Sequence, residues 1–208
     1  MNGVSHAAIG GVTGLVVASG IGADPTTTVI LAIAGGVTAL VPDLDTGGKL
    51  ANKITIPHGF IRAILTILGL LIIAYSWFTG PDTDQWLGIL IGTSVLVIGQ
   101  KITKKIMLIL TGVTLGFAGV LLGKLWVILA ATYIIIASFL PHRSYTHSLI
   151  GLLYFSYIAY LFSKDINING IFITSILGYS SHLVADMRII PFNKRGIKLL
   201  RPISNIEF

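Results

Sequence analysis

Long runs of hydrophobic residues occupy most of the chain and are separated by short polar stretches. The runs are continuous and do not alternate with polar residues, which favours helices over the strands of a membrane barrel. Several runs are shorter than the roughly 20 residues that an upright helix needs to cross a bilayer core. The pattern therefore predicts an all-α fold, a polytopic integral membrane helical bundle of about eight transmembrane or re-entrant helices. The runs cover residues 4–22, 27–41, 59–79, 86–100, 105–123, 125–141, 148–163 and 170–186.

The composition strengthens the membrane interpretation. Of the 208 residues, 54% are hydrophobic and only 11% are charged, whereas a soluble domain carries about 25% charged residues. We therefore expect a membrane-embedded domain over residues 1–186. Residues 1–21 contain no Lys or Arg ahead of their hydrophobic run, so we expect a retained first helix and not a cleaved signal peptide. The chain has no cysteine, which excludes disulfides and thiolate metal ligands.

The basic residues predict the orientation of the helices. Lys and Arg are concentrated in the connection 42–62, near 101–105 and in residues 187–208, whereas the connections 23–26 and 80–85 are acidic. In an eight-helix arrangement the three basic segments share one side, which the positive-inside rule assigns to the cytoplasm. We therefore expect a multi-pass protein of the cell (inner) membrane with cytoplasmic N and C termini. Residues 187–208 would be a basic tail on lipid headgroups, so the net charge of +6 needs no nucleic-acid partner.

Four polar motifs interrupt the hydrophobic pattern, and the predicted orientation places all of them at one membrane face. His182 and Asp186 are four residues apart and therefore share one face of a helix. Asp43 and Asp45 follow Pro42, and in an extended segment both carboxylates would point the same way. The candidate metal ligands are three aspartates and four histidines: His6, Asp43, Asp45, His142, His147, His182 and Asp186.

These side chains together favour a metal site. Taken singly, each motif has a simpler interpretation, such as a helix-end His–Asp hydrogen bond, a solvated turn or an anchor to the membrane interface. Together, carboxylates and neutral imidazoles at one face could hold one or two divalent ions. Mixed nitrogen and oxygen ligands allow Zn, Mn, Fe or Mg. The guanidinium of Arg143 suits a phosphate oxygen, and we predict catalytic roles for Arg143 and Asp45.

Small residues recur four positions apart at three places in two of the predicted helices, at Gly10–Gly14, Gly112–Gly116 and Gly119–Gly123. Such patterns let helix backbones approach closely. They predict tight packing within the chain, or between two copies in a homo-oligomer.

In these motifs the chain resembles the YdjM-like family of inner-membrane metal-dependent hydrolases. The resemblance implies a membrane hydrolase in which five residues match the polar positions of the family: His6, Asp43, His147, His182 and Asp186. Two departures are Thr46, where the family often has His, and Ser144-Tyr145, where it often has Gly. The matching stretches are Ser5-His6, Pro42–Asp45, His142-Arg143 with Thr146–Ser148, Gly178–Asp186 and Gly196–Pro202.

The expected function is metal-dependent hydrolysis of a phosphoester in a lipid or lipid-linked substrate at the cytoplasmic face, with membrane lipids as partners. Two alternatives remain open, a metal or ion transporter and a membrane scaffold with a structural metal. Intramembrane His and Asp also line ion pathways, but transporter sites usually lie near the bilayer midplane. A serine mechanism through Ser148 or Ser144 beside His147 is less favoured, because it leaves Asp43 and Asp45 without a role.

The orientation can be tested with single cysteines, since the chain has none of its own. Cysteines at Asn52 and Asn205 are expected to resist a membrane-impermeant thiol reagent in intact cells, and a cysteine at Thr83 is expected to react. All three positions lie in predicted polar connections or in the tail, so each reports the side on which it lies. Labelling of the cysteines at Asn52 and Asn205 would place these segments outside the cell and contradict the predicted orientation.

Overall fold

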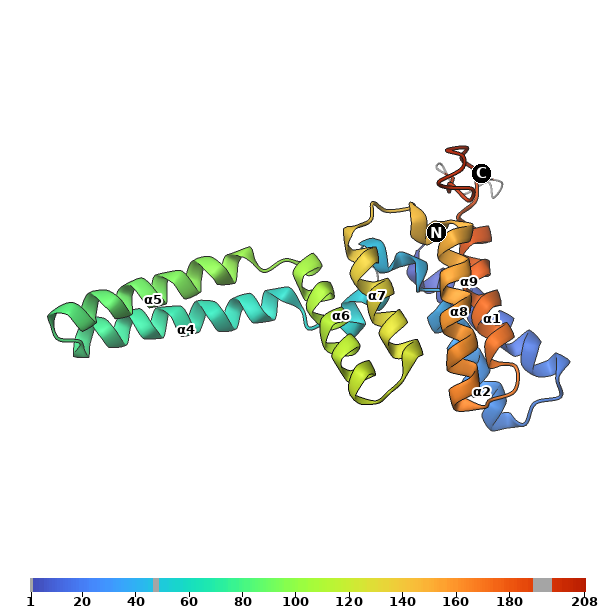
Figure 1. Ribbon diagram of the computed structural model, residues 1–208, viewed down its shortest axis with the longest axis horizontal. Helices are drawn as coiled ribbons and strands as arrows, with labels where there is room; N and C mark the ends of the chain where they lie inside the picture. The colour runs from blue at the N-terminus through green and yellow to red at the C-terminus, as the bar shows by residue number, and fades with distance from the viewer. Residues whose placement is uncertain (1, 47–48, 189–195) are drawn as a thin grey trace. The chain divides into compact units, whose positions relative to one another are not determined.

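The computed structural model describes residues 2–46, 49–188 and 196–208, and every regular element in these ranges is helical. The helices are α1 (Gly3–Gly20), α2 (Pro25–Thr38), α3 (Lys49–Ile54), α4 (His58–Thr79), α5 (Asp82–Lys101), α6 (Lys104–Leu121), α7 (Leu125–Phe139), α8 (Leu149–Ile166) and α9 (Ile171–Asp186). Two short 3-10 helices, η1 (Pro42–Thr46) and η2 (Tyr145–His147), lie in the connections after α2 and α7. Figure 1 shows the course of the chain.

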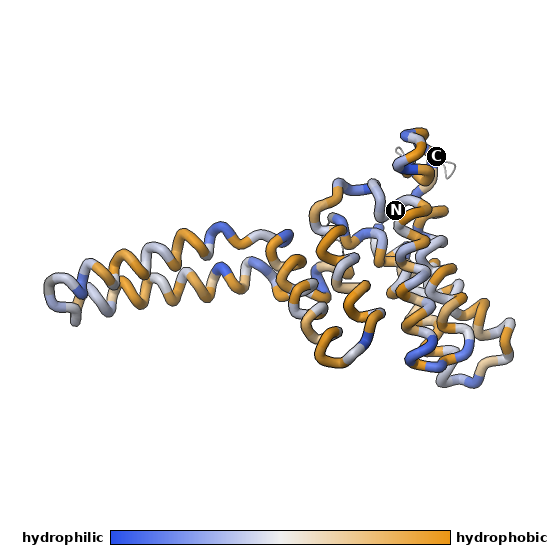
Figure 2. The backbone as a smooth tube through the Cα atoms, in the orientation of Figure 1, coloured by the Kyte–Doolittle hydropathy of each residue, from blue (hydrophilic) through white to orange (hydrophobic). Residues whose placement is uncertain are grey.

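The helices confirm the predicted all-α membrane fold. The eight hydrophobic runs correspond to α1, α2 and α4 to α9, and Figure 2 shows hydrophobic residues along these helices. Among the described residues, five helices are long and apolar enough to cross a membrane, and α7 is a shorter apolar helix. The five are Gly3–Gly20, Pro25–Asp45, His58–Thr79, Lys104–Leu121 and Leu149–Ile166. The short helix α3 was not predicted, because its six residues lie in a polar connection.

The chain divides into two compact units, a division that the hydrophobic pattern did not indicate. The first unit consists of Met1–Ile54 and Leu108–Phe208, and the second is Thr55–Met107. The second unit is built on the α4–α5 hairpin. Its helices approach closely at Gly69, where an added Cβ would lie 2.8 Å from the carbonyl oxygen of Gly92.

Side-chain caps fix where the first two helices begin. The Asn2 side chain accepts hydrogen bonds from the backbone N–H groups of Val4 and Ser5, each at 3.0 Å, so α1 begins at Gly3. The Asp24 side chain caps α2 in the same way, and Pro25 occupies the first turn, where its missing N–H costs nothing. The Asn2 cap places the His6 side chain within the first two turns of α1.

Glycines bring α1, α2 and α9 into backbone contact. An added Cβ at Gly10 would lie 2.3 Å from the carbonyl oxygen of Gly35, and one at Gly14 would lie 2.1 Å from that of Leu31. On α9, an added Cβ at Gly178 would lie 2.6 Å from the same oxygen of Gly35. These neighbours are backbone atoms, which cannot rotate away as a flexible side chain can. The predicted close packing at Gly10–Gly14 is therefore found within the chain.

Other predicted glycine contacts also lie within the chain. An added Cβ at Gly112 would lie 2.5 Å from the Ile135 side chain, and one at Gly119 would lie 2.9 Å from the backbone nitrogen of Ile128. Gly112 and Gly119 of α6 thus face α7. Association of two copies through these helices stays a prediction.

Part of the predicted tail contacts the helical unit. In residues 196–208, Ile197 is fully buried, and the Arg201 guanidinium donates to Ser144 Oγ at 2.9 Å. The expectation that the tail lies on lipid headgroups remains a prediction. Residues 189–195 of that tail lie outside the described residues.

The contact between α1 and α2 predicts that Gly35→Ala destabilises the protein. The Cβ of the new alanine at position 35 would lie 2.1 Å from the carbonyl oxygen of Gly10, so α1 and α2 must separate. Overpacking of this kind costs about 1–3 kcal/mol. The measurement is the thermal unfolding of purified protein in detergent. Gly20→Ala is the matched control, because no heavy atom lies within 4 Å of its added Cβ, and equal unfolding temperatures for both variants would contradict the expectation.

Candidate metal centre

All seven candidate ligands lie together at one end of the first unit, although they come from four distant segments. His6 Nε2 lies 3.4 Å from Asp186 Oδ1, which joins the start of α1 to the end of α9. His147 Nε2 lies 3.5 Å from Asp43 Oδ1, which joins η2 to η1. In Figure 1 the N-terminus, the start of α8 and the end of α9 meet at this end. The predicted convergence of the polar motifs is therefore a feature of the fold.

Four ligand atoms form a compact cage at the centre of this cluster: Asp43 Oδ1, His147 Nε2, His182 Nε2 and Asp186 Oδ2. The two imidazole nitrogens are 3.1 Å apart. Their distances to the two carboxylate oxygens are 3.5 and 3.6 Å for Asp43 and 3.8 and 3.7 Å for Asp186. Ligands at about 2.0–2.1 Å from a tetrahedral ion lie about 3.3 Å apart. Asp43, His147 and His182 therefore have the donor types and spacing that could hold a divalent ion, and Asp186 Oδ2 lies within 3.8 Å of both imidazole nitrogens.

The His182 imidazole has its protonation pattern fixed by the backbone. Nδ1 lies 2.7 Å from the carbonyl oxygen of Ala39. A carbonyl oxygen only accepts hydrogen bonds, so Nδ1 carries the proton. In the neutral ring Nε2 is then unprotonated, and its lone pair faces the cage. Metal-binding histidines commonly donate a hydrogen bond from the ring nitrogen that does not bind the metal, and this bond fixes the ring orientation.

The His147 imidazole is oriented in the same manner from the other side. The Thr146 hydroxyl donates to Asp45 Oδ2 at 2.6 Å, so it is left to accept from His147 Nδ1, which lies 3.1 Å away. Asp45 Oδ2 itself lies 3.4 Å from Nδ1. These acceptors place the ring proton on Nδ1, and the Nε2 lone pair faces the lone pair of His182. Two facing lone pairs need a cation between them, either a proton or a metal ion.

The surrounding charges favour a cation at this point. Burial of the His147 ring lowers its pKa, but hydrogen bonds and charges from Asp43 and Asp45 outweigh that effect. The pKa of His147 consequently lies above its ordinary value. The carboxylates therefore attract positive charge to the imidazole, and the same attraction would act on a bound ion.

The structure separates the two aspartates that the sequence grouped together. The prediction of an extended segment was wrong, because Pro42–Thr46 forms the 3-10 helix η1. Asp43 faces Nε2 of His147, and Asp45 faces Nδ1 of the same ring. Asp45 Oδ1 also contacts His142 Nδ1 at 3.1 Å. Asp45 and His142 thus border the cage on its outer side and form a second group with His147 that could hold an ion.

His6 extends the cluster beyond the cage. Its ring stacks on His182 with a centroid distance of 3.8 Å, and its Nε2 faces Asp186 Oδ1 while Oδ2 faces the cage. His6 Nδ1 is buried without a hydrogen-bond partner among the described residues. His6, His182 and Asp186 form a further group that could hold an ion. One or two ions, as predicted, are both compatible with this geometry.

Arg143 lies at the partly exposed edge of the cluster. Its Nη2 is 3.2 Å from Asp186 Oδ2, and its backbone adopts the left-handed conformation with φ of 57°. A non-glycine residue in this region is held there by its surroundings. The side chains of Arg143 and Asp43 are 22% and 18% exposed, whereas those of His147 and His182 are fully buried. The cluster is therefore accessible on the side of Arg143 and Asp43.

Two supporting groups were not predicted. Thr146 was noticed only as a neighbour of His147, and its hydrogen bond to Asp45 spans 101 positions in the sequence. The carbonyl oxygen of Ala39 is a backbone atom and has no signal in the sequence. Both groups orient the imidazoles, and only the folded chain reveals them.

The comparison with protein families gives one match. The model of the family described as YdjM inner membrane protein matches residues 1–208. No match was found among curated proteins or among solved structures. The family and the apolar helices agree that this is a membrane protein. Because the match covers the whole chain, the chain belongs to the YdjM inner membrane protein family.

Proposed function

We propose that this protein is a membrane-embedded, metal-dependent hydrolase that cleaves a phosphoester of a lipid or lipid-linked substrate at the cytoplasmic face. The observation that carries the proposal is the pair of imidazole nitrogens, His147 Nε2 and His182 Nε2, that face each other at 3.1 Å between two carboxylates. Their other ring nitrogens are held by Asp45, Thr146 and a backbone carbonyl. Such an arrangement is typical of metal ligands and their supporting groups.

The roles of the side chains follow from their positions. Asp43, His147 and His182 would hold the ion together with Asp186, which lies within 3.8 Å of both imidazole nitrogens. Asp45 with Thr146 keeps the His147 ring in its orientation. A divalent ion held there would supply Lewis-acid activation of water and neutralise charge on a phosphoryl oxygen. Zn, Mn, Fe and Mg all accept these ligands. Arg143, at the exposed edge, would bind an anionic group of the substrate beside the ion.

The position of the cluster in the helices favours hydrolysis over transport. His6 is the fourth residue of α1, Asp43 follows α2, and Asp186 is the last residue of α9. Ligands at helix ends lie near the membrane interface, where the phosphate of a lipid is found. Sites in transporters usually lie near the bilayer midplane.

A membrane scaffold with a structural metal is the second candidate, and one observation favours it. Four protein ligands complete a tetrahedral site, and structural zinc sites are closed in this way. An octahedral ion such as Mn or Mg would retain open positions with the same four ligands. The two candidates differ in turnover, because only the hydrolase cleaves a substrate.

Metal content tests the site itself. His182→Ala, Asp186→Ala and Asp43→Ala are each expected to reduce the metal bound by purified protein, because each removes a ligand from the cage. Asp45→Asn is expected to weaken metal affinity by about 10–100-fold, as the loss of a supporting group does. The measurement is elemental analysis after equilibration with Zn or Mn. His58→Ala, in the second unit, is the matched control, and full occupancy in Asp186→Ala would contradict the proposed ligand set.

Turnover of Arg143→Lys tests the role of Arg143 in binding phosphate. Lysine keeps the charge but lacks the planar fork of the guanidinium. We expect unchanged metal content and a loss of about 3 kcal/mol in transition-state stabilisation, or roughly a hundredfold in rate. The assay uses a chromogenic phosphodiester and a fluorescent phospholipid in detergent with added Mn or Zn. Undiminished turnover in Arg143→Lys, together with its loss in His182→Ala, would retain the hydrolase and reject the phosphate contact.

A further inference from the structure

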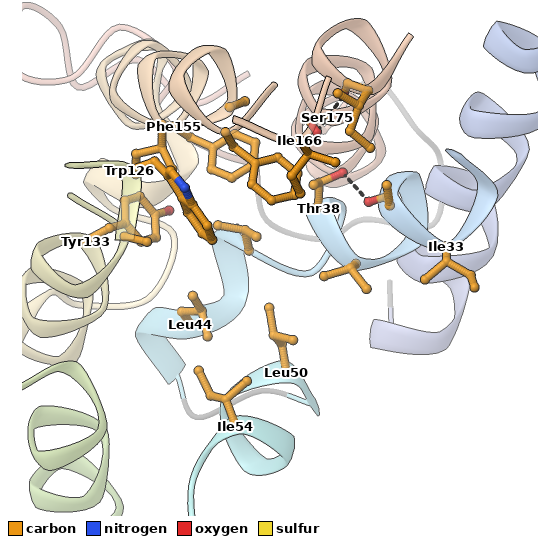
Figure 3. Close-up of a pocket in the computed structure, with 18 of the residues that line it drawn as sticks. Ile33, Thr38, Leu44, Leu50, Ile54, Trp126, Tyr133, Phe155, Ile166 and Ser175 are labelled. Carbon is orange, nitrogen blue, oxygen red and sulfur yellow. Dashed lines mark hydrogen bonds between the residues drawn. The ribbon is translucent and has the colours of Figure 1, made fainter. Parts of the chain in front are cut away.

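A large apolar cavity reaches Leu44, the residue between Asp43 and Asp45 in the sequence. Its volume is about 610 Å³, within the range of roughly 300–1,000 Å³ typical of ligand pockets. Leu44 lines the cavity together with Tyr133, Trp126 and Phe155 (Figure 3). The wall continues along α2, α7 and α8 to Ile166.

The wall of the cavity offers little to a polar ligand. The hydroxyl of Thr38 donates to the carbonyl oxygen of Ala34 at 2.8 Å, and that of Ser175 donates to the carbonyl oxygen of Ile171 at 2.8 Å. The two remaining polar side chains of the described wall are likewise bonded. The Tyr133 hydroxyl lies 3.0 Å from that of Tyr179, and the Trp126 indole donates to Asp165 at 3.1 Å.

Water is a poor occupant for such a space. A buried water needs two to four polar partners, and an apolar cavity without them stays dry and binds apolar molecules. Protein interiors also rarely leave voids much larger than a water molecule. In a membrane protein, the surrounding bilayer supplies hydrocarbon that can fill the cavity.

The length of the cavity matches one lipid chain. From Phe155 to Ile166 on α8, the wall extends for about 16 Å at a rise of 1.5 Å per residue. One leaflet of the hydrocarbon core is about 15 Å deep, half of roughly 30 Å. A chain in the cavity would thus extend into the membrane while its polar end lies at Leu44, beside the metal centre.

We propose that this cavity binds the hydrocarbon chain of the lipid whose phosphate lies at the metal centre, an inference that rests on the proposed function. The ligand comes from the surrounding bilayer and has an anionic phosphate headgroup and a long alkyl or prenyl chain. The chain fixes the depth of the lipid in the membrane, so the phosphoester bond is held at the cage and the rest of the headgroup extends toward Arg143 and Asp43.

Ala159→Phe and Ala130→Phe test the cavity from two helices, because both side chains line it. Leu153→Phe is the matched control on α8, since Leu153 is 68% exposed and does not line the cavity. In the parent and in each variant, Trp77 and Trp86 are replaced by Phe, which leaves Trp126 on the cavity wall as the single tryptophan. All proteins are first checked for a single, monodisperse species in detergent.

Binding is measured with a phosphatidylglycerol that carries bromine atoms on one chain and quenches Trp126 fluorescence. The parent and Leu153→Phe are expected to show saturable quenching with one lipid per chain. The two cavity variants are expected to need at least about tenfold more lipid, since an overpacked site no longer accepts the chain. Unsaturable quenching in the parent, or equal quenching in all variants, would overturn the cavity as a lipid site. If one cavity variant fails to fold, the other decides the result.

Turnover separates this inference from the proposed function. Ala159→Phe is expected to cleave a chain-free chromogenic phosphodiester like the parent and a long-chain phospholipid at least about tenfold more slowly. Equal cleavage of both substrates would retain the hydrolase and overturn the inference. If Ala159→Phe loses lipid binding but cleaves the phospholipid like the parent, the bound lipid is structural, and the inference is also overturned. If the parent cleaves neither substrate, the proposed function fails, and with it the assignment of the bound lipid as substrate.

Discussion

The close approach of α1, α2 and α9 holds the candidate metal ligands together. Gly10, Gly35 and Gly178 allow backbone contacts that no larger residue would permit. Each of these helices carries part of the candidate metal centre at one end: His6 on α1, Asp43 shortly after α2, and the His182–Asp186 pair on α9. Small residues in the middle of the helices therefore determine how closely charged residues meet at their ends.

The charged cluster in turn determines what the site can bind. Burying a charge costs several kcal/mol unless a counter-charge and hydrogen bonds compensate for it. Asp45 has such partners in Thr146 and His142, and Asp186 contacts Arg143. The facing nitrogens of the two buried histidines have their lone pairs directed at one point, where positive charge is needed. A proton or a divalent cation would meet that requirement, and the proposed hydrolase would bind the cation there and the hydrocarbon chain of its substrate in the apolar cavity.

Much of this could be predicted from the sequence. The uninterrupted hydrophobic runs predicted the helices, because a bilayer leaves few alternatives for such segments. The distribution of Lys and Arg predicted that His6, Asp43, His147 and Asp186 would meet at one face, and they do lie together. The conformation of Pro42–Thr46 was predicted wrongly, because a proline restricts its neighbours but does not distinguish a strand from a 3-10 helix. The partners that orient the imidazoles depend on contacts more than 100 positions apart and could not be predicted.

The central claim is that a metal ion lies between His147 and His182, and anomalous X-ray scattering from crystals grown with Mn or Zn tests it most directly. We expect a peak about 2.0–2.2 Å from Nε2 of both residues, with Asp43 and Asp186 as further ligands. A second peak beside His6 would indicate a two-ion centre. An unoccupied cage, with the two nitrogens still facing each other in the presence of saturating metal, would contradict the account.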